Sequence, residues 1–206
     1  AENLDGKLAL TGQEFIHAIK TFRLGVGDNV NIITGDDYIY TCRLAEVGKS
    51  EARLEIISKE LNNANPKTDL TVYQCMLKKD NIEFLIQRLT EVGVKTFIPV
   101  LSENVVKNDV NLPRIDKISI ESGKQSGRSR LIEVKSAIKF SELIKQIADY
   151  DLFIVAHEKE INSRLSKLDF SSAKNVALLI GPEGGISDSE IEACAKAGAK
   201  VIGLGA

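Results

Sequence analysis

The sequence predicts an α/β protein in two parts: a small β-barrel, followed by a mainly parallel sheet covered by helices. The first prediction rests on closely spaced strand patterns near the start, and the second on a regular alternation of strand and helix patterns from Leu70 onward. With 206 residues, of which 43% are hydrophobic, the chain is long enough to bury such cores. Aromatic residues make up only 5%, so the cores must consist mainly of Leu, Ile, Val and Ala.

The first part contains three short segments with strand composition, Val30–Ile33, Tyr38–Ala45 and Ala52–Ile57. The turn-forming sequence Thr34–Asp37 separates the first two, which is typical of a hairpin. The preceding segment Thr11–Phe22 has apolar residues spaced as on one face of a helix. We therefore expect antiparallel strands that form a small barrel, with a short helix closing one end.

A polar segment, Asn62–Lys67, separates this part from the rest of the chain. Pro66 disfavours helix at the residue before it, and the hydrophobic pattern differs on the two sides of the segment. We expect a domain boundary here, with residues 1–66 forming a barrel domain and residues 67–206 forming an α/β domain.

From Leu70 onward, apolar segments typical of buried strands alternate with segments that have one apolar helical face. This alternation predicts parallel strands connected by helices that cover both faces of the sheet. The expected strands are Leu70–Met76, Phe97–Val100, Leu152–Ala156, Val176–Ile180 and Lys200–Leu204. The expected helices begin near Asn81, Arg114, Ser141 and Ser187.

Several helix ends are marked by residues with a physical role there. Asn81 can accept hydrogen bonds from the first turn of a helix, and Gly93 can adopt the left-handed conformation that follows one. Ser187 and Glu190 form a capping-box pattern. The alternation also predicts a helix after Leu204, so we expect a C-terminal tail to be missing from the sequence.

Composition narrows the class of protein. The chain has no apolar run of about 18 residues and no signal-peptide pattern, so we expect a cytoplasmic protein without membrane contact. Cys42, Cys75 and Cys194 show no metal-binding spacing, so we expect buried free thiols and no metal site. The net charge of −2 disfavours a protein that coats nucleic acid.

One segment carries a local excess of positive charge. Residues 107–139 contain eight basic and four acidic residues, an excess of four. Such an excess either marks a surface that contacts phosphate groups or is an ordinary solvated face.

The segment Leu178–Ser187 has the most informative pattern in the chain: an apolar strand, the sequence Gly-Pro-Glu-Gly-Gly, and then the capped helix. Unpaired backbone N–H groups at a helix start, together with glycines that allow close approach, are typical of a ligand-binding loop. The pattern is neither a Walker phosphate loop nor a dinucleotide-binding fingerprint. A tight turn without a ligand is the alternative interpretation.

This loop resembles the cofactor-binding loop of the RsmE family, the 16S ribosomal RNA uridine-N3 methyltransferases of the SPOUT class. Ile202–Gly205 resembles the family's second cofactor loop. Further matches are Thr90–Val94, Lys124–Arg128, His17, Phe22–Arg23 and Gly27–Asp28. The last three resemble the entry to the family's PUA-like barrel.

The resemblance implies a SPOUT-type knotted α/β domain behind a PUA-like barrel, acting as a homodimer with S-adenosyl-L-methionine as cofactor. It also implies methyl transfer to N3 of a uridine in 16S ribosomal RNA, either free or in the assembled small subunit. The implied cofactor-binding residues are Ala156, His157, Glu158, Ile180, Gly181, Pro182, Glu183, Gly184, Gly185, Ile186, Gly203, Leu204 and Gly205.

The chemistry requires a residue that removes the N3 proton or stabilises the resulting anion. Glu183, inside the glycine-rich loop, is the first candidate for this catalytic role, although it can also serve only to order the loop. His157 is the second candidate, because histidine side chains can exchange protons near neutral pH, but a histidine at the end of a strand is more often structural.

Four basic residues are candidate RNA contacts: Arg23, Lys124, Arg128 and Arg130. The guanidinium of Arg128 suits neutralisation of phosphate or of the uridine anion, so we also count Arg128 as catalytic. A surface salt bridge is the alternative, and the position of Arg128 in the matched signature favours RNA contact. For Arg130, RNA contact and an ordinary surface salt bridge remain equal alternatives.

Other functions are compatible with much of the same sequence. A different SPOUT enzyme, methylating a ribose 2′-hydroxyl or a purine, would share the cofactor fold, and a non-enzymatic RNA-binding protein would share the barrel. A nicotinamide-dependent enzyme is disfavoured because the dinucleotide fingerprint is missing.

Overall fold

The computed structural model describes residues 2–4, 7–77, 79–103 and 111–204. Backbone contacts divide the chain into two compact units. The first contains residues 1–65 together with the short segment 127–130, and the second contains residues 66–126 and 131–206. No pattern in the sequence indicates that residues 127–130 pack with the first unit.

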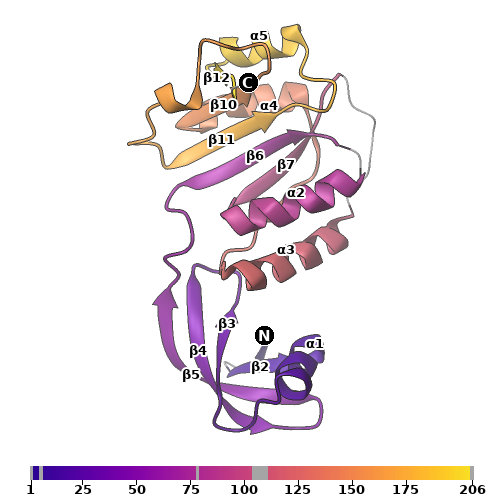
Figure 1. The fold of residues 1–206 in the computed structure, drawn as a ribbon, viewed down its shortest axis with the longest axis vertical. Helices are drawn as coiled ribbons and strands as arrows, with labels where there is room; N and C mark the ends of the chain where they lie inside the picture. Colours follow the sequence, from indigo (N-terminus) through magenta and orange to yellow (C-terminus); the bar gives the residue numbers. More distant parts are fainter. Residues whose placement is uncertain (1, 5–6, 78, 104–110, 205–206) are drawn as a thin grey trace. The chain divides into compact units, whose positions relative to one another are not determined.

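The first unit is built around an antiparallel sheet (Figure 1). Its strands, in spatial order, are β1 (Glu2–Leu4), β2 (Lys7–Thr11), β5 (Glu51–Leu61), β4 (Tyr38–Val47) and β3 (Asn29–Ile33). The predicted hairpins that join β3 to β4 and β4 to β5 are confirmed. The pairing of β1 with β2 was not predicted, because each strand is too short to show a clear alternation.

Two register shifts between β4 and β5 bend this sheet. They lie at Thr41/Cys42 and Leu44/Glu46, and irregularities of this kind increase the local twist of a strand pair. The concave side encloses a small core that includes Leu10, Leu44 and Leu54. The result is the curled, PUA-like sheet that the strand spacing and the resemblance led us to expect.

The predicted helix before these strands is present, but only its first turn is an α-helix. It consists of α1 (Gly12–Phe15) followed by the π-helix η1 (Ile16–Thr21). The backbone N–H of Phe22 bonds to the carbonyl of His17 over 3.0 Å, which is the wider spacing of a π-helix. Arg23 then adopts a left-handed conformation with φ of 58° and ends the segment.

The second unit contains a parallel sheet whose strands come from distant parts of the sequence. They are β6 (Asp69–Cys75), β7 (Thr96–Leu101), β8 (Glu133–Val134), β9 (Ile138–Lys139), β10 (Leu152–Ala156), β11 (Asn175–Ile180) and β12 (Lys200–Ile202). The spatial order is β12-β10-β11-β6-β7-β8, with β9 also pairing with β7, and every pairing is parallel. This confirms the predicted mainly parallel α/β architecture.

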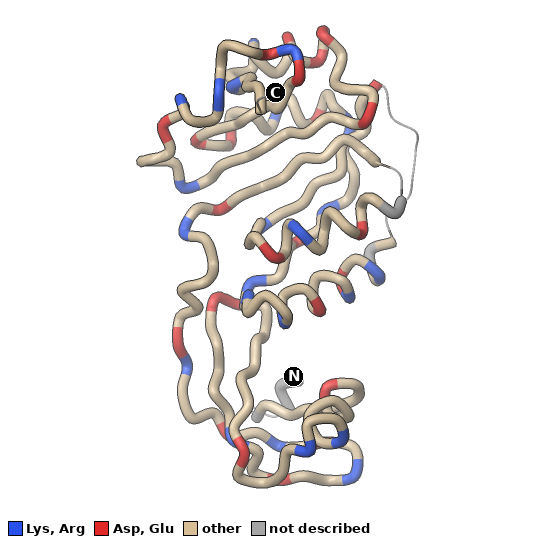
Figure 2. The backbone as a smooth tube through the Cα atoms, viewed as in Figure 1, with Lys and Arg blue, Asp and Glu red and all other residues tan. Residues whose placement is uncertain are grey.

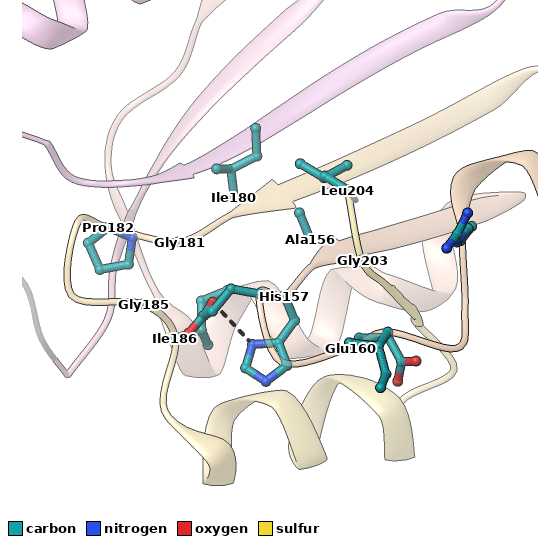
Figure 3. A pocket seen from close by; sticks show the side chains of 13 residues that line it. Ala156, His157, Glu160, Ile180, Gly181, Pro182, Gly185, Ile186, Gly203 and Leu204 are labelled. Atoms are coloured by element: carbon teal, nitrogen blue, oxygen red, sulfur yellow. Dashed lines mark ion pairs between the residues drawn. The ribbon is translucent and has the colours of Figure 1, made fainter. Parts of the chain in front are cut away.

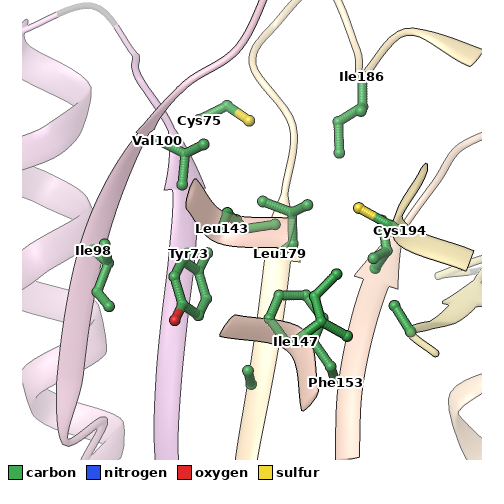
Figure 4. Packing of buried hydrophobic residues seen from close by; sticks show 13 residues of the cluster. Tyr73, Cys75, Ile98, Val100, Leu143, Ile147, Phe153, Leu179, Ile186 and Cys194 are labelled. Atoms are coloured by element: carbon green, nitrogen blue, oxygen red, sulfur yellow. The ribbon is translucent and has the colours of Figure 1, made fainter. Parts of the chain in front are cut away.

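Helices cover both faces of this sheet, as the alternation predicted. The helices are α2 (Lys79–Val92), α3 (Leu112–Ser126), α4 (Phe140–Gln146) and α5 (Asp188–Lys196), with short 3₁₀ turns at Ile147–Asp149 and Leu165–Lys167. One core packs Ile86 of α2 and Ile115 of α3 against Val72 and Phe97. The other packs α4 and α5 against the opposite face, where Tyr73, Leu179 and Phe153 lie on three adjacent strands (Figure 4).

Several boundaries differ from the sequence predictions by a few residues, and two short strands were not predicted. The helix α2 begins at Lys79, so Asn81 lies inside the helix and does not cap it. The strand β12 ends at Ile202, two residues before the predicted end. The strands β8 and β9 were not predicted, because each has only two residues and so shows no periodic pattern.

Candidate functional site

Three loops meet at one edge of the parallel sheet, because β10, β11 and β12 are neighbours that run in the same direction. Ligands of α/β proteins commonly bind at the carboxyl ends of such strands. A cavity of about 460 Å³ lies there (Figure 3). It is lined by Ala156, His157, Glu158, Glu160, Ile161, Arg164, Ile180, Gly181, Pro182, Gly185, Ile186, Gly203 and Leu204.

The glycine-rich loop after β11 has two positions that disfavour a side chain, Gly181 because of close packing and Gly185 because of its positive φ. A Cβ atom at Gly181 would lie 2.8 Å from Cγ1 of Ile186. Gly185 has φ of 77°, and a Cβ there would lie 3.0 Å from Oε1 of Glu158. A hydrogen bond of 2.9 Å from the N–H of Gly185 to the carbonyl of Pro182 closes the turn. These positions therefore require glycine.

A buried glutamine of the neighbouring strand β6 holds the start of this loop. The Nε2 atom of Gln74 lies 2.9 Å from the carbonyl oxygen of Gly181 and 3.3 Å from that of Ile180. Gln74 is 3% exposed, so these bonds form away from water. Sequence reasoning missed this residue, although a glutamine within an otherwise apolar strand was a possible signal.

The helix after the loop begins with the predicted capping box. The N–H of Glu190 donates to Oγ of Ser187 over 3.3 Å, and the N–H of Ser187 donates to Oε2 of Glu190 over 3.2 Å. The second carboxylate oxygen of Glu190 accepts from the N–H of Glu103 over 3.2 Å. The buried carboxylate thus connects the start of α5 to the segment after β7.

The last strand is fixed against the loop that follows β10. The N–H of His157 donates to the carbonyl of Ile202, and the N–H of Gly203 donates to the carbonyl of Ser163, both over 2.9 Å. Gly203 also forms a parallel bridge with Arg164. A Cβ atom at Gly203 would overlap the carbonyl oxygen of Glu160, so glycine is required here too.

His157 lines the cavity and lies beside the carboxylate of Glu158. Its Nδ1 atom is 3.5 Å from Oε2 of Glu158, the pair marked by the dashed line in Figure 3. The residue is 9% exposed, and within the described residues this nitrogen has no hydrogen-bond partner. Such a buried polar atom is available to a ligand or a water molecule.

The loop after β10 contributes three lining residues that sequence reasoning missed: Glu160, Ile161 and Arg164. Hydrogen bonds from the N–H groups of Ser163 and Asn162 hold the pKa of the Glu160 carboxyl below its usual value. Glu160 therefore stays ionised and shapes the turn that presents the neighbouring residues. No strand, helix or motif pattern marked this loop.

Ten predicted cofactor-binding residues line the cavity: Ala156, His157, Glu158, Ile180, Gly181, Pro182, Gly185, Ile186, Gly203 and Leu204. Two others of the same loop, Glu183 and Gly184, are exposed and do not line it. The Oε1 atom of Glu183 accepts a hydrogen bond from Nδ2 of Asn81 over 3.5 Å, at the outer limit for such a bond. Gly205 lies outside the described residues.

The predicted RNA-binding residues fall in both units. Arg23 is exposed in the first unit, and Lys124 is exposed at the end of α3 in the second. Arg128 and Arg130 belong to the segment that packs with the first unit, where Nε of Arg130 lies 2.7 Å from Oδ1 of Asp37. The salt-bridge alternative for Arg130 is therefore present in the structure.

Two asparagines hold this segment in place. Nδ2 of Asn62 donates to the carbonyl of Gly127 over 2.8 Å, and Nδ2 of Asn65 donates to Oγ of Ser129 over 2.9 Å. Ser129 is fully buried. The attachment of residues 127–130 thus depends on polar contacts between positions more than 60 residues apart in sequence.

Charges of both signs alternate along α2 and α3 (Figure 2). Arg114 is paired with Glu83, and Lys117 lies 4.0 Å from Glu121. The local excess of basic residues is therefore partly neutralised on these helices. Within the described residues, no helix has the length and apolar character to span a membrane, and no cluster of three or more His, Cys, Asp or Glu could hold a metal ion.

Comparison with known proteins identifies relatives of nearly the whole chain. Residues 63–206 match the family described as "RNA methyltransferase domain", and residues 10–57 match "RNA methyltransferase PUA domain". Ribosomal RNA small subunit methyltransferase E of Bacillus subtilis (strain 168) is 31% identical over 211 residues, covering 96% of this chain and 82% of that protein. The protein of the same name from Rickettsia conorii (strain ATCC VR-613 / Malish 7) is 29% identical, covering 100% and 84%.

A solved structure shares the fold of both parts. It is a ribosomal RNA small subunit methyltransferase E from Neisseria gonorrhoeae bound to S-adenosyl methionine, which matches with a TM-score of 0.83 at 24% identity, over 99% of this chain and 86% of that one. The family match over residues 63–206 and the relative that is 31% identical confirm the predicted resemblance. The chain belongs to the RNA methyltransferase family of ribosomal RNA small subunit methyltransferase E, the RsmE family.

Proposed function

We propose that the protein is an S-adenosyl-L-methionine-dependent methyltransferase that modifies N3 of a specific uridine in 16S ribosomal RNA. The observation that carries this proposal is one cavity lined by the three loops that follow β10, β11 and β12. Family membership supports it, because the relatives in Bacillus and Rickettsia are named as small-subunit ribosomal RNA methyltransferases.

The cavity fits this cofactor in size and in chemistry. Its volume lies within the range of roughly 300–1,000 Å³ that is typical of small-molecule sites. Ile180, Ile186 and Leu204 offer apolar contacts to a flat base, and the tight packing at Gly181 and Gly203 leaves main-chain groups next to the ligand. When bound, the cofactor supplies an electrophilic methyl group on a sulfonium sulfur.

The path of the chain at the cavity supports the trefoil knot that the resemblance implies. Ile202 and Gly203 are hydrogen-bonded to His157 and Ser163, so the last strand passes directly beside the loop 157–164. A knot in which the end of the chain is drawn through that loop would need this contact. Knots are otherwise nearly absent from proteins.

Uridine N3 carries a proton that must be removed during the transfer, and base pairing hides this atom in a duplex. We assign proton removal to Glu183, whose exposed carboxylate lies on the glycine-rich loop. His157 is the alternative, because its Nδ1 atom is buried at the cavity without a hydrogen-bond partner in the described part of the chain. The target uridine must be unpaired or flipped out of its stack.

The proposed partner is the RNA of the small ribosomal subunit, either free or in the assembled particle. We assign contacts with its phosphate groups to Arg23, Lys124, Arg128 and Arg130, and to Arg128 also the stabilisation of the uridine anion. Because Arg130 is paired with Asp37, its contact with RNA would require exchange of that ion pair. We further infer that the protein acts as a homodimer in the cytoplasm.

Methyl transfer to isolated subunits tests this function. Small ribosomal subunits from cells lacking the protein are incubated with radiolabelled S-adenosyl-L-methionine and the purified protein, and the RNA is digested to nucleosides. We expect the label in 3-methyluridine and in no other nucleoside. Label in a 2′-O-methylated nucleoside or a methylated purine would assign another SPOUT activity, and RNA binding without any label would leave only an RNA-binding function.

A further inference from the structure

We infer that Arg164 binds the carboxylate at the amino-acid end of the methyl donor. This inference rests on the proposed function and names a specificity-determining residue at the same cavity. Arg164 is exposed and lines the cavity, and it follows β10 in the loop that no sequence pattern had marked.

The charges around the cavity single out this residue. The ionisable side chains that line it within the described residues are His157, Glu158, Glu160 and Arg164. Two of them are carboxylates, which repel a ligand carboxylate and attract the positively charged ammonium and sulfonium groups of the donor. Arg164 carries the only permanent positive charge in this set, so it is the side chain that attracts the ligand carboxylate most strongly.

Neighbouring basic residues are engaged elsewhere. Nζ of Lys159 lies 2.7 Å from Oδ1 of Asp188, and Nζ of Lys167 donates to the carbonyl of Asn162 over 3.1 Å. Neither lysine lines the cavity. In the described part of the chain the guanidinium of Arg164 forms no ion pair or hydrogen bond, which leaves its planar set of N–H donors available for a carboxylate.

The backbone of Arg164 is held in place before any ligand binds. It forms a parallel bridge with Gly203, and the preceding carbonyl, that of Ser163, accepts the N–H of Gly203 over 2.9 Å. The carbonyl of Arg164 in turn accepts the N–H of Lys167 over 3.0 Å. A fixed main chain reduces the conformational entropy that is lost when the side chain binds a ligand.

The experiment compares two ligands that differ only at the amino-acid end. S-adenosylhomocysteine keeps the carboxylate, whereas 5′-methylthioadenosine lacks the whole amino-acid group. In calorimetric titrations of the full chain, we expect Arg164→Ala to weaken binding of S-adenosylhomocysteine roughly ten-fold or more and to leave binding of 5′-methylthioadenosine unchanged. Arg164→Lys keeps the positive charge but cannot form the bidentate contact of a guanidinium with a carboxylate, so it should give an intermediate loss of affinity for S-adenosylhomocysteine.

Lys200→Ala is the matched control, because it removes an exposed positive charge of the same unit, at the start of β12, and Lys200 does not line the cavity. It should leave both affinities unchanged. Equal weakening of both ligands by Arg164→Ala, or no weakening of either, would overturn the inference. If the wild-type protein bound neither ligand, the proposed function itself would fail, and this inference with it.

Discussion

The side-chain amide of Gln74 donates to the carbonyl oxygen of Gly181 over 2.9 Å, so a buried residue of β6 fixes the first peptide of the glycine-rich loop. The same amide reaches the carbonyl of Ile180, the last residue of β11. The loop therefore has its position set from the centre of the sheet before a ligand enters the cavity.

Replacing Gln74 by Leu should weaken cofactor binding. The substitution keeps a buried side chain of similar size but leaves the carbonyls of Ile180 and Gly181 without this donor, at a cost of about 1–3 kcal/mol. We expect a clear loss of affinity for S-adenosylhomocysteine in calorimetry, together with a lower thermal midpoint. Gln13→Leu, at an exposed position of α1, serves as control and should change neither quantity. Unchanged affinity in Gln74→Leu would show that the loop holds its shape without this amide.

Gly203→Ala should destabilise the second unit. The added methyl group would overlap the carbonyl oxygen of Glu160, so the loop 157–164 must move away from the last strand. Overpacking of this kind costs about 1–3 kcal/mol. Thermal unfolding should show a lower midpoint, whereas Gly25→Ala, where a Cβ meets nothing within 4 Å, should behave as the wild type. Equal midpoints for Gly203→Ala and the wild type would contradict the close approach.

Ser187→Ala removes the cap of α5. The N–H of Glu190 loses its acceptor, and the loss should lower the free energy of unfolding by about 1 kcal/mol. Chemical denaturation measures this difference. Ser136→Ala replaces an exposed serine outside the helices and should have no effect. A result in which both variants unfold alike would mean that the capping box adds nothing to stability.

Because two buried thiols have raised pKa values, we expect the free energy of unfolding to fall at high pH. Burial raises the pKa of Cys75 to about 11 and that of Cys194 to about 12, from 9.0. The pKa values of both thiols are higher in the folded chain than in the unfolded chain. Their contribution to the free energy of unfolding is therefore complete below pH 9 and is lost as the pH rises toward 11 and 12. The stability difference between the wild type and Cys194→Ala should therefore shift against the wild type between pH 8 and pH 10.5.

Denaturation with urea at several pH values checks this prediction, and the comparison with the variant removes the contribution of other groups that titrate in the same range. A stability difference independent of pH would show that the Cys194 thiol titrates alike in the folded and unfolded chains.

The three cysteines should also resist alkylation at pH 8 until the protein unfolds, because all of them are buried and free.

Local sequence patterns predicted the parts of this fold that depend on neighbouring residues. The strand β10 spans the predicted residues, the capping box of Ser187 and Glu190 forms, and Gly93 adopts the expected positive φ of 84°. Each of these features is determined by side chains within a few positions of one another. The glycine-rich loop was recognised for the same reason.

Features that depend on distant contacts could not be predicted in this way. Gln74 acts on residues more than 100 positions away, and Arg164 lines the cavity in a loop whose backbone pairs with Gly203. The attachment of residues 127–130 to the first unit depends on Asn62 and Asn65, which read in the sequence as an ordinary linker. Such contacts follow from the topology of the sheet and from the path of the chain, neither of which has a local signature.

The most direct test of the proposed activity is mass spectrometry of 16S ribosomal RNA from cells in which the gene for this protein is deleted. We expect one uridine to lose its N3 methyl group in the deleted strain and to regain it when the wild-type gene is restored. A restored copy that carries Gln74→Leu should return less of the modification. An unchanged set of methylated nucleotides in the deleted strain would show that this protein does not methylate 16S ribosomal RNA in the cell.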